Sequence, residues 1–169
     1  MKIRIAIAVF LVLIVLDVGV SLAHTMKPVG IVVHHTALAD SDGPAAIAQL
    51  HKDRGFGAFY WWREYYIGYH YLIMPDGTIV ETRPEHLQGA HATTANDTIG
   101  ICLMGNFDEG SGGHPPTPAQ MKSLTLLTKK LMQKYQWQVS RVHRHLDINS
   151  GTLCPGNLLP WDDFIHSLG

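Results

Sequence analysis

The stretch VGIVVHH, residues 29–35, is a β-branched apolar run that ends in two histidines. Because the run is short, continuous and bounded by Pro28 and Thr36, it predicts a buried strand. Successive side chains of a strand point to opposite faces, so only one of His34 and His35 can reach a metal ion on a given face. The alternation leaves open which of the two histidines it is.

The residues after this strand alternate between helical and irregular patterns. Ser41 and Asp42 are candidate N-caps and Pro44 suits a first helical turn, which predicts a helix over residues 44–54. The aromatic stretch 59–66 has no clean period and predicts a loop with exposed rings. Its tryptophans could stack on sugar faces or pack in the core.

The rest of the chain supplies further strands and a long helix. Thr117, followed by Pro118 and with Gln120 three positions on, forms a capping box and begins an amphipathic helix. The other expected elements are a hairpin over 69–82 with its turn at 75–77, strands over 98–104 and 139–143, a Gly/Pro-rich loop over 105–116 and a closing helix over 160–168. Strands interleaved with helices indicate one α/β domain.

Composition narrows the classes of function. The chain has 169 residues, enough for one domain with a core, and its net charge of -1 lacks the basic footprint of a nucleic-acid-binding protein. Two cysteines are too few for a framework of several disulfides. The 11 histidines nearly equal the 13 lysines and arginines, and histidine is the commonest metal ligand, so the composition points to a metal site.

Residues 1–23 have the pattern of a secretory signal peptide. Lys2 and Arg4 precede an apolar run over 5–16, which is shorter than the roughly 20 apolar residues that span a bilayer. Because Ser21 and Ala23 form a small-x-small cleavage site, we expect cleavage after Ala23, a mature domain over 24–169 and a secreted or periplasmic location. The alternative is an uncleaved anchor, which would be the only contact of the chain with a membrane.

Several histidines and one cysteine stand at the ends of the expected strands or in the loops that follow them. Taken singly they carry little weight, because a histidine at a strand end is more often a satisfied polar residue than a ligand. Catalytic zinc sites take three donors from imidazole, thiolate or carboxylate groups and leave one position for water. One histidine of the pair 34–35, together with His145 and Cys154 around one late loop, would supply three such donors.

The motifs together resemble the zinc-dependent N-acetylmuramoyl-L-alanine amidases, which include bacteriophage amidase lysozymes and animal peptidoglycan recognition proteins. The resemblance runs from about Val29 to Trp161. The motifs that carry it are IVVHHTA at 31–37, IGYHYLI at 67–73, GAHA at 89–92 with Asn96, IGI at 99–101 with GNF at 105–107, and HLD at 145–147 leading to CPG at 154–156. Five motifs in this order are far more specific than any one of them.

The resemblance implies a fold, a reaction and a site. The fold would be a mixed central β-sheet flanked by helices, in a single domain like that of the recognition proteins. The reaction would be hydrolysis of the amide between N-acetylmuramic acid and L-alanine in peptidoglycan or muropeptides, by a chain that we expect to be a monomer. Zinc would be held by His34, His145 and Cys154. Tyr69 and Thr152 would be catalytic, hydrogen-bonding the attacking water or the developing oxyanion. His91 and Asn96 would line the substrate cleft, and the alternative for His91 is a purely structural role.

Two features depart from the usual family pattern or discriminate within it. The late loop reads Arg144-His145-Leu146-Asp147 instead of beginning Gly-His-Arg-Asp, so His143 is kept as an alternative ligand. Cys102 and Cys154 occupy positions where the cytosolic branch tends to have acidic residues, which favours the exported branch. No Asp or Glu has a clear claim to be the general base.

Two other functions remain open at this point. Some family members bind peptidoglycan without cutting it, but these generally lack a complete metal triad, so three candidate ligands favour an enzyme. A cysteine peptidase would need Cys102 or Cys154 as its nucleophile, and Cys102 lies inside an apolar strand.

Most of the other histidines need no catalytic role. We expect His35 and His70 to point away from the ligand-bearing face of the sheet. The remaining ones are expected to be solvated: His24, His51, His86, His114 and His166. A hydrogen-bond acceptor for the second nitrogen of a ligand histidine is expected, but the sequence does not identify it.

Overall fold

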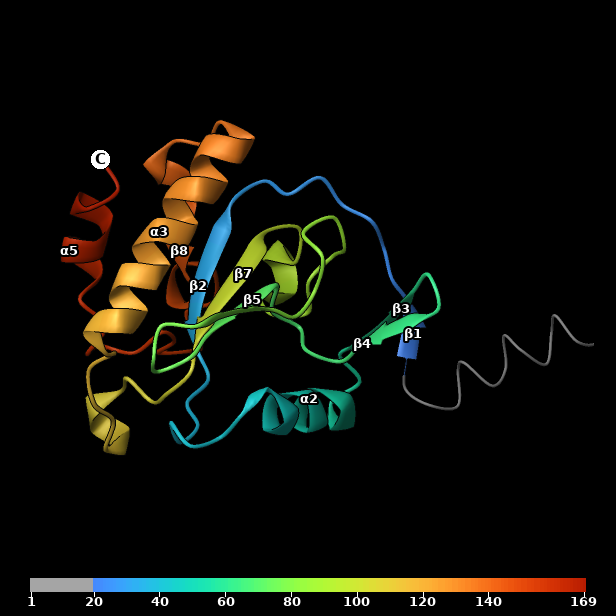
Figure 1. Ribbon diagram of the computed structural model, residues 1–169, viewed down its shortest axis with the longest axis horizontal. Coiled ribbons are helices and arrows are strands. Elements are labelled where there is room, and N and C mark those ends of the chain that lie inside the picture. The colour runs from blue at the N-terminus through green and yellow to red at the C-terminus, as the bar shows by residue number, and fades with distance from the viewer. Residues whose placement is uncertain (1–19) are drawn as a thin grey trace, which may run out of the picture.

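The computed structural model describes residues 20–169, so the apolar run of the predicted signal peptide lies outside the described residues. A five-stranded sheet in the order β6-β5-β7-β2-β8 forms the centre of the domain (Figure 1). Its strands are β2 (Ile31–His35), β5 (Tyr71–Ile73), β6 (Ile79–Glu81), β7 (Ile99–Leu103) and β8 (Val142–Arg144). The helices are α2 (Pro44–Asp53), α3 (Pro118–Tyr135), α4 (His145–Ile148) and α5 (Trp161–His166).

The sheet is mixed, as expected. β2 pairs in parallel with β7 and with β8, β7 pairs in parallel with β5, and β6 closes one edge in antiparallel pairing with β5. All residues of β2 and β7 are buried, because helices cover both faces of these central strands. The carboxyl ends of β2 and β8 therefore lie side by side at one edge of the sheet.

Each face of the sheet has its own apolar layer. On one face, Ile31 and Val33 pack with α3 and α5 in the main core. On the other face, Leu72 and Cys102 pack with Ile47 of α2 in a smaller cluster. Figure 1 shows α3 and α5 together on one side and α2 on its own below the strand ends. A side chain of β2 therefore faces either the α3 layer or the α2 layer, depending on its position in the alternation.

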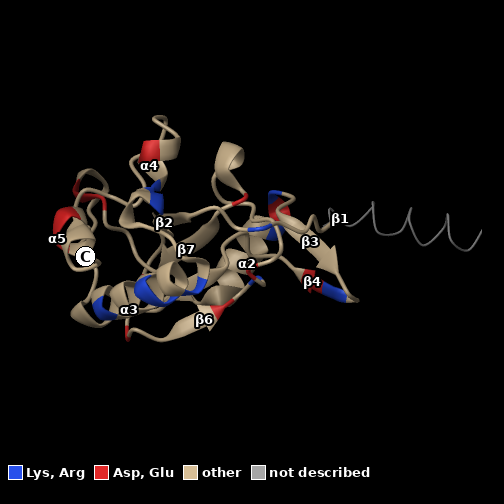
Figure 2. Ribbon diagram, turned by 90° about the horizontal axis from the view of Figure 1, so that it is seen from above, with Lys and Arg blue, Asp and Glu red and all other residues tan. Residues whose placement is uncertain are grey.

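The start of α3 confirms the predicted capping box. The Thr117 hydroxyl accepts the Gln120 N–H at 3.0 Å, and the Gln120 side-chain oxygen accepts the Thr117 N–H at 3.0 Å. The Gln120 amide also donates to the carbonyl oxygens of Ile73 and Met104, which ties the helix to the sheet. Basic and acidic residues are interspersed along the ribbon, and α3 carries several lysines (Figure 2).

The prediction of a loop over 59–66 is wrong. This stretch forms the hairpin of β3 (Gly57–Tyr60) and β4 (Arg63–Tyr65), and β1 (Val20–Leu22) pairs with β3 at its edge. Trp61 and Trp62 form the turn with φ of 47° and 64°, a left-handed region that usually selects Gly or Asn, so the sequence carries no turn pattern here. Trp61 and Trp62 are 78% and 88% exposed, so the expected exposure is confirmed and the alternative that they pack in the core is wrong.

Smaller differences concern element boundaries. The N-cap of α2 is Gly43, and neither Ser41 nor Asp42 caps the helix. The strand expected over 139–143 begins only at Val142, after a short 3-10 turn, and the helix α4 that follows it has no counterpart in the expected elements. β1 falls within the predicted signal peptide, so cleavage after Ala23 would remove this edge strand from its small sheet.

Gly68→Ala is expected to destabilise the protein, because a Cβ at Gly68 would lie 2.1 Å from the backbone oxygen of Ala90. Neither backbone segment can move freely, since Ala90 N–H donates to the Gly68 oxygen at 3.0 Å. The loss should be roughly 1–3 kcal/mol in the free energy of unfolding, measured by urea denaturation. Gly110→Ala is the control, because its nearest atom would be at 3.5 Å. Equal stabilities of the two variants would contradict the prediction.

Candidate metal centre

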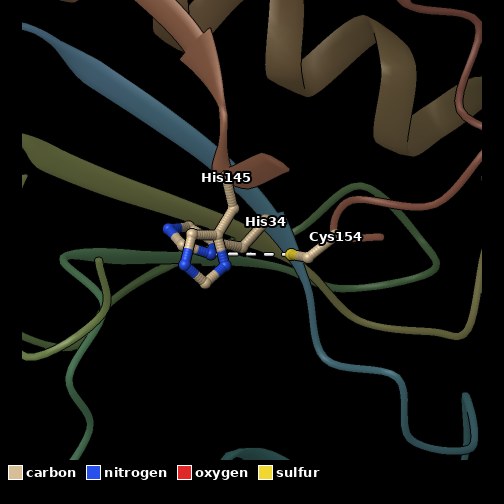
Figure 3. Close-up of side chains that lie close together, drawn as sticks. All are labelled: His34, His145 and Cys154. Carbon is tan, nitrogen blue, oxygen red and sulfur yellow. Dashed lines mark hydrogen bonds between the residues drawn. The ribbon is translucent and has the colours of Figure 1, made fainter. Parts of the chain in front are cut away.

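Three side chains from separate elements meet at the carboxyl ends of β2 and β8. His34 is the next-to-last residue of β2, His145 begins α4 directly after β8, and Cys154 lies in the loop after α4. One ligand atom of each lies within 4.8 Å of the others, and the Cys154 Sγ is 3.6 Å from the His34 Nδ1 (Figure 3). The structure thus brings together the three residues that the resemblance implied as zinc ligands.

The two faces of the sheet separate His34 from His35. His34 lies opposite Cys102 in the parallel register, on the face covered by α2. The ring of His35 faces the α3 layer, where its Nδ1 accepts the Phe107 N–H at 3.0 Å and the ring packs on Phe107. His34 is therefore the histidine of the pair that reaches the site, as strand alternation requires.

Two further histidines lie outside the ligand group. His143 is in β8, and the group of potential ligands in the described residues contains His145 and not His143. His70 is buried in the sheet, where its Nδ1 accepts the Gly100 N–H at 3.0 Å and its Nε2–H donates to the Leu87 oxygen at 2.9 Å. His70 is a structural residue, but the prediction that it points away from the ligand-bearing face is wrong, because its ring lies 5.8 Å from the ring of His91, which in turn contacts His34.

Burial sets the protonation of the ligand group. It lowers the pKa of His34 well below the usual value, aided by the neighbouring His91 and His145, and it also lowers the pKa of His145. Burial raises the pKa of the Cys154 thiol to about 12. The His35 backbone N–H donates to Sγ at 3.4 Å, and this hydrogen bond lowers the same pKa by less than burial raises it. Two neutral imidazoles and a thiol that needs a cation to ionise are a donor set that fits zinc.

The second nitrogen of His34 is bound by His91. The His34 Nε2 and the His91 Nδ1 are 3.0 Å apart, and the His91 Nε2 lies 3.1 Å from the Thr98 carbonyl oxygen. Asn96 accepts the N–H groups of His91 and Ala92 at 2.8 and 2.9 Å through its side-chain oxygen. The partner of the ligand histidine that the sequence left unidentified is thus His91. Burial lowers the pKa of His91 to about 3, so its ring is neutral at neutral pH.

A cleft of about 490 Å³ opens next to the ligand group. Tyr69, His91, Asn96 and His145 are among its lining residues, so the predicted cleft residues His91 and Asn96 do border it. Among the lining residues Arg54 alone carries a permanent charge, and none is acidic. Sequence reasoning missed Arg54, because this residue caps the end of α2 and belongs to none of the motifs.

His51 also borders this cleft, and the prediction that it is solvated is wrong. It is buried in the last turn of α2, and its Nδ1 accepts the Gly68 N–H at 2.9 Å. His24, His86, His114 and His166 are exposed, as expected. The helical period places His51 on the inner face of α2 with Ile47, which is the pattern that could have revealed its burial.

Tyr69 and Thr152 flank the ligand group in different ways. The ring of Tyr69 lies 5.1 Å from that of His34, and burial raises the pKa of its phenol well above the usual value, so Tyr69 is an O–H donor. The Thr152 hydroxyl accepts the Cys154 N–H at 3.1 Å and so braces the loop that carries the thiol. The thiol of Cys102 is fully buried, and burial raises its pKa, which disfavours it as a nucleophile.

The zinc-free protein is expected to lose stability on acidification, because the buried His70 has a pKa of about 4 against 6.5 for a free histidine. Burial is the main cause. Since the folded pKa is the lower one, the stabilisation is complete above pH 6.5 and is lost as the pH falls toward 4, by roughly 3 kcal/mol for this group. Urea unfolding at pH 7.5 and 4.5 measures the loss. His70→Asn keeps an acceptor for Gly100 but does not titrate, so it should show a smaller pH dependence; an unchanged dependence would contradict the assignment.

The mixed sheet and the His-His-Cys group define an α/β protein with the donor set of a metallohydrolase. A family model described as N-acetylmuramoyl-L-alanine amidase matches residues 24–157, and the chain belongs to this family. It therefore has the activity of that family on peptidoglycan. This assignment favours the enzyme over the binding module and over the cysteine peptidase considered from the sequence.

Relatives and solved structures agree with the family. The chain is 38% identical over 120 residues to the endolysin of Escherichia phage T7, covering 69% of this chain and 74% of that protein. Among structures, the N-acetylmuramoyl-L-alanine amidase LysC from Clostridium intestinale URNW is 37% identical with a TM-score of 0.74, over 88% of this chain and 90% of LysC. The Drosophila peptidoglycan recognition protein SD, 23% identical with a TM-score of 0.63 over 82% of each chain, shares the fold.

Proposed function

We propose that the chain is a zinc-dependent amidase that hydrolyses the bond between N-acetylmuramic acid and L-alanine, with His34, His145 and Cys154 as the zinc ligands. The observation that carries this proposal is the convergence of two neutral imidazoles and one thiol within 4.8 Å beside the cleft. These three residues would hold the zinc ion, and the chemistry that it would supply there is polarisation of the amide carbonyl and activation of water.

The chain's own residues then orient the substrate and stabilise charge. In the hydrolysis, the water oxygen bonds to the lactyl carbonyl carbon, the carbon–nitrogen bond breaks, and the alanine nitrogen takes a proton. The Tyr69 phenol, kept protonated by burial, donates to the oxygen that becomes negative. Thr152 holds the Cys154 loop through its hydroxyl oxygen and keeps its own O–H for the same oxyanion.

The charge of the cleft suits an anionic stem peptide. Arg54 gives the cleft a permanent positive charge, and the residues that line the cleft include no carboxylate. No carboxylate of the described residues forms an ion pair with Arg54. A peptide in this cleft that carries a free carboxylate would pair with the guanidinium.

The proposed site of action is outside the cytoplasmic membrane. The support is the sequence of residues 1–23, with its basic start, apolar run and small-x-small site. Within residues 20–169, no helix is long and apolar enough to cross a membrane. N-terminal sequencing of the exported protein tests the proposal, and a terminus before residue 20 would show that the segment is retained.

The reaction is tested on purified peptidoglycan. Release of new L-alanine amino termini is expected, with loss of activity on chelation and recovery on addition of zinc. Binding of peptidoglycan without release of amino termini would contradict the proposal, and so would activity that a chelator leaves unchanged.

A further inference from the structure

We infer that His91 is a positioning residue of the metal centre, which holds His34 in the tautomer whose Nδ1 lone pair faces the other ligands. The inference rests on the proposed zinc site. It assigns His91 a role different from the substrate contact that the sequence suggested, although the residue also borders the cleft.

Two hydrogen bonds link His34 to His91 and His91 to the Thr98 carbonyl oxygen, and this last acceptor fixes the direction of both. The Thr98 carbonyl oxygen can only accept, so the His91 Nε2, 3.1 Å away, carries the proton. In a neutral ring the His91 Nδ1 then bears a lone pair, and it accepts a proton from the His34 Nε2 at 3.0 Å. The remaining nitrogen of His34, Nδ1, is left with its lone pair, 3.6 Å from the Cys154 Sγ. The ligand therefore presents an unprotonated nitrogen to the metal position.

The residues around His91 hold its ring in this position. A Cβ at Gly89 would lie 2.3 Å from the His91 Cδ2, and a Cβ at Gly100 would lie 2.8 Å from the same ring. Two glycines from different segments thus provide the space that the ring fills. Asn96 fixes the backbone of the same turn through its bonds to the His91 and Ala92 N–H groups.

The same bonds argue against His91 as a substrate-binding group. Both of its ring nitrogens have partners within the protein, so neither is left to donate to or accept from a stem peptide. Partners of this kind orient metal-bound histidines, and their removal typically weakens metal binding by about 10–100-fold.

The test compares three substitutions of His91 by zinc affinity, measured by competition with a chelator. His91→Leu removes the acceptor and should weaken zinc binding by about 10–100-fold. In His91→Asn the side-chain oxygen stands near the position of Nδ1, so the affinity should stay within about threefold of the wild type. His91→Gln places its oxygen one carbon further out, and it should resemble the leucine variant. Thr93→Ala, which also borders the cleft, is the control with unchanged affinity.

Folding of each zinc-free variant is followed by circular dichroism and thermal unfolding. If the leucine variant does not fold, the asparagine and glutamine variants carry the comparison, because they share an amide and differ only in its reach. Leucine or glutamine variants that bind zinc as tightly as the wild type would overturn the inference alone, and so would an asparagine variant as weak as they are. A wild-type protein that does not bind zinc would overturn the proposed metal site and the inference with it.

Discussion

Cys154→Ala is expected to abolish amidase activity, with a loss of more than about 10³-fold in kcat/KM. The substitution leaves two imidazoles of the ligand group, whereas catalytic zinc sites use three protein ligands. The stabilisation of transition-state charge by the metal amounts to several kcal/mol, and about 1.4 kcal/mol corresponds to tenfold in rate. Zinc content and turnover of the purified variant are measured together, and both should fall.

The matched control is Cys102→Ala. Cys102 is the only other cysteine, is fully buried and lies opposite His34 in the neighbouring strand, but it is not in the ligand group. This variant should lose stability through the small cavity and keep its zinc content within a few-fold of the wild type. Zinc content is the readout of this control, because the Cys102 thiol is a hydrogen-bond partner of the Tyr69 side chain. Loss of zinc in Cys102→Ala would contradict the ligand group as assigned.

Tyr69→Phe is expected to lower kcat by about 10²-fold or more while zinc content stays normal. The substitution removes only the O–H group, and the phenyl ring can keep the packing on His34 and on His51. Removing one preorganised donor to an oxyanion typically costs about 10²–10³-fold in kcat. Because burial raises the pKa of this phenol, it acts as a donor and not as a base.

Tyr71→Phe is the control for this experiment. The Tyr71 hydroxyl donates to Glu85 at 2.6 Å and Tyr71 is not among the residues that line the cleft, so turnover should be unchanged even if stability falls. Near-normal turnover in Tyr69→Phe would remove Tyr69 from the mechanism. A loss of zinc in that variant would show that its effect is on the metal site and not on the transition state.

Much of the fold could be predicted because its central elements follow local rules. β2 and β7 are continuous apolar runs, which is what strands buried on both faces require. α3 begins at a capping box that is complete within four residues. The hairpin of β3 and β4 was missed because its turn consists of Trp61 and Trp62, which no local rule places in left-handed conformation.

For the site, too, some features could be predicted from the sequence and others could not. The sequence by itself determined the types of donor and placed His34 and His145 at or just after the ends of expected strands, because the periodicity of a strand is a local property. It also contained the order of motifs that identifies the amidase family.

Only the tertiary structure decided how these groups are used. His34, and not His35, reaches the site because its side chain lies on the face of the sheet that α2 covers, whereas His35 faces the α3 layer. His51 was buried by the packing of α2, and Arg54 was placed beside the cleft at the end of the same helix. His91 became the partner of His34 through a bond between residues 57 positions apart. A hydrogen bond of this kind depends on distances and directions that are fixed only when the whole sheet has formed, so no local pattern encodes it.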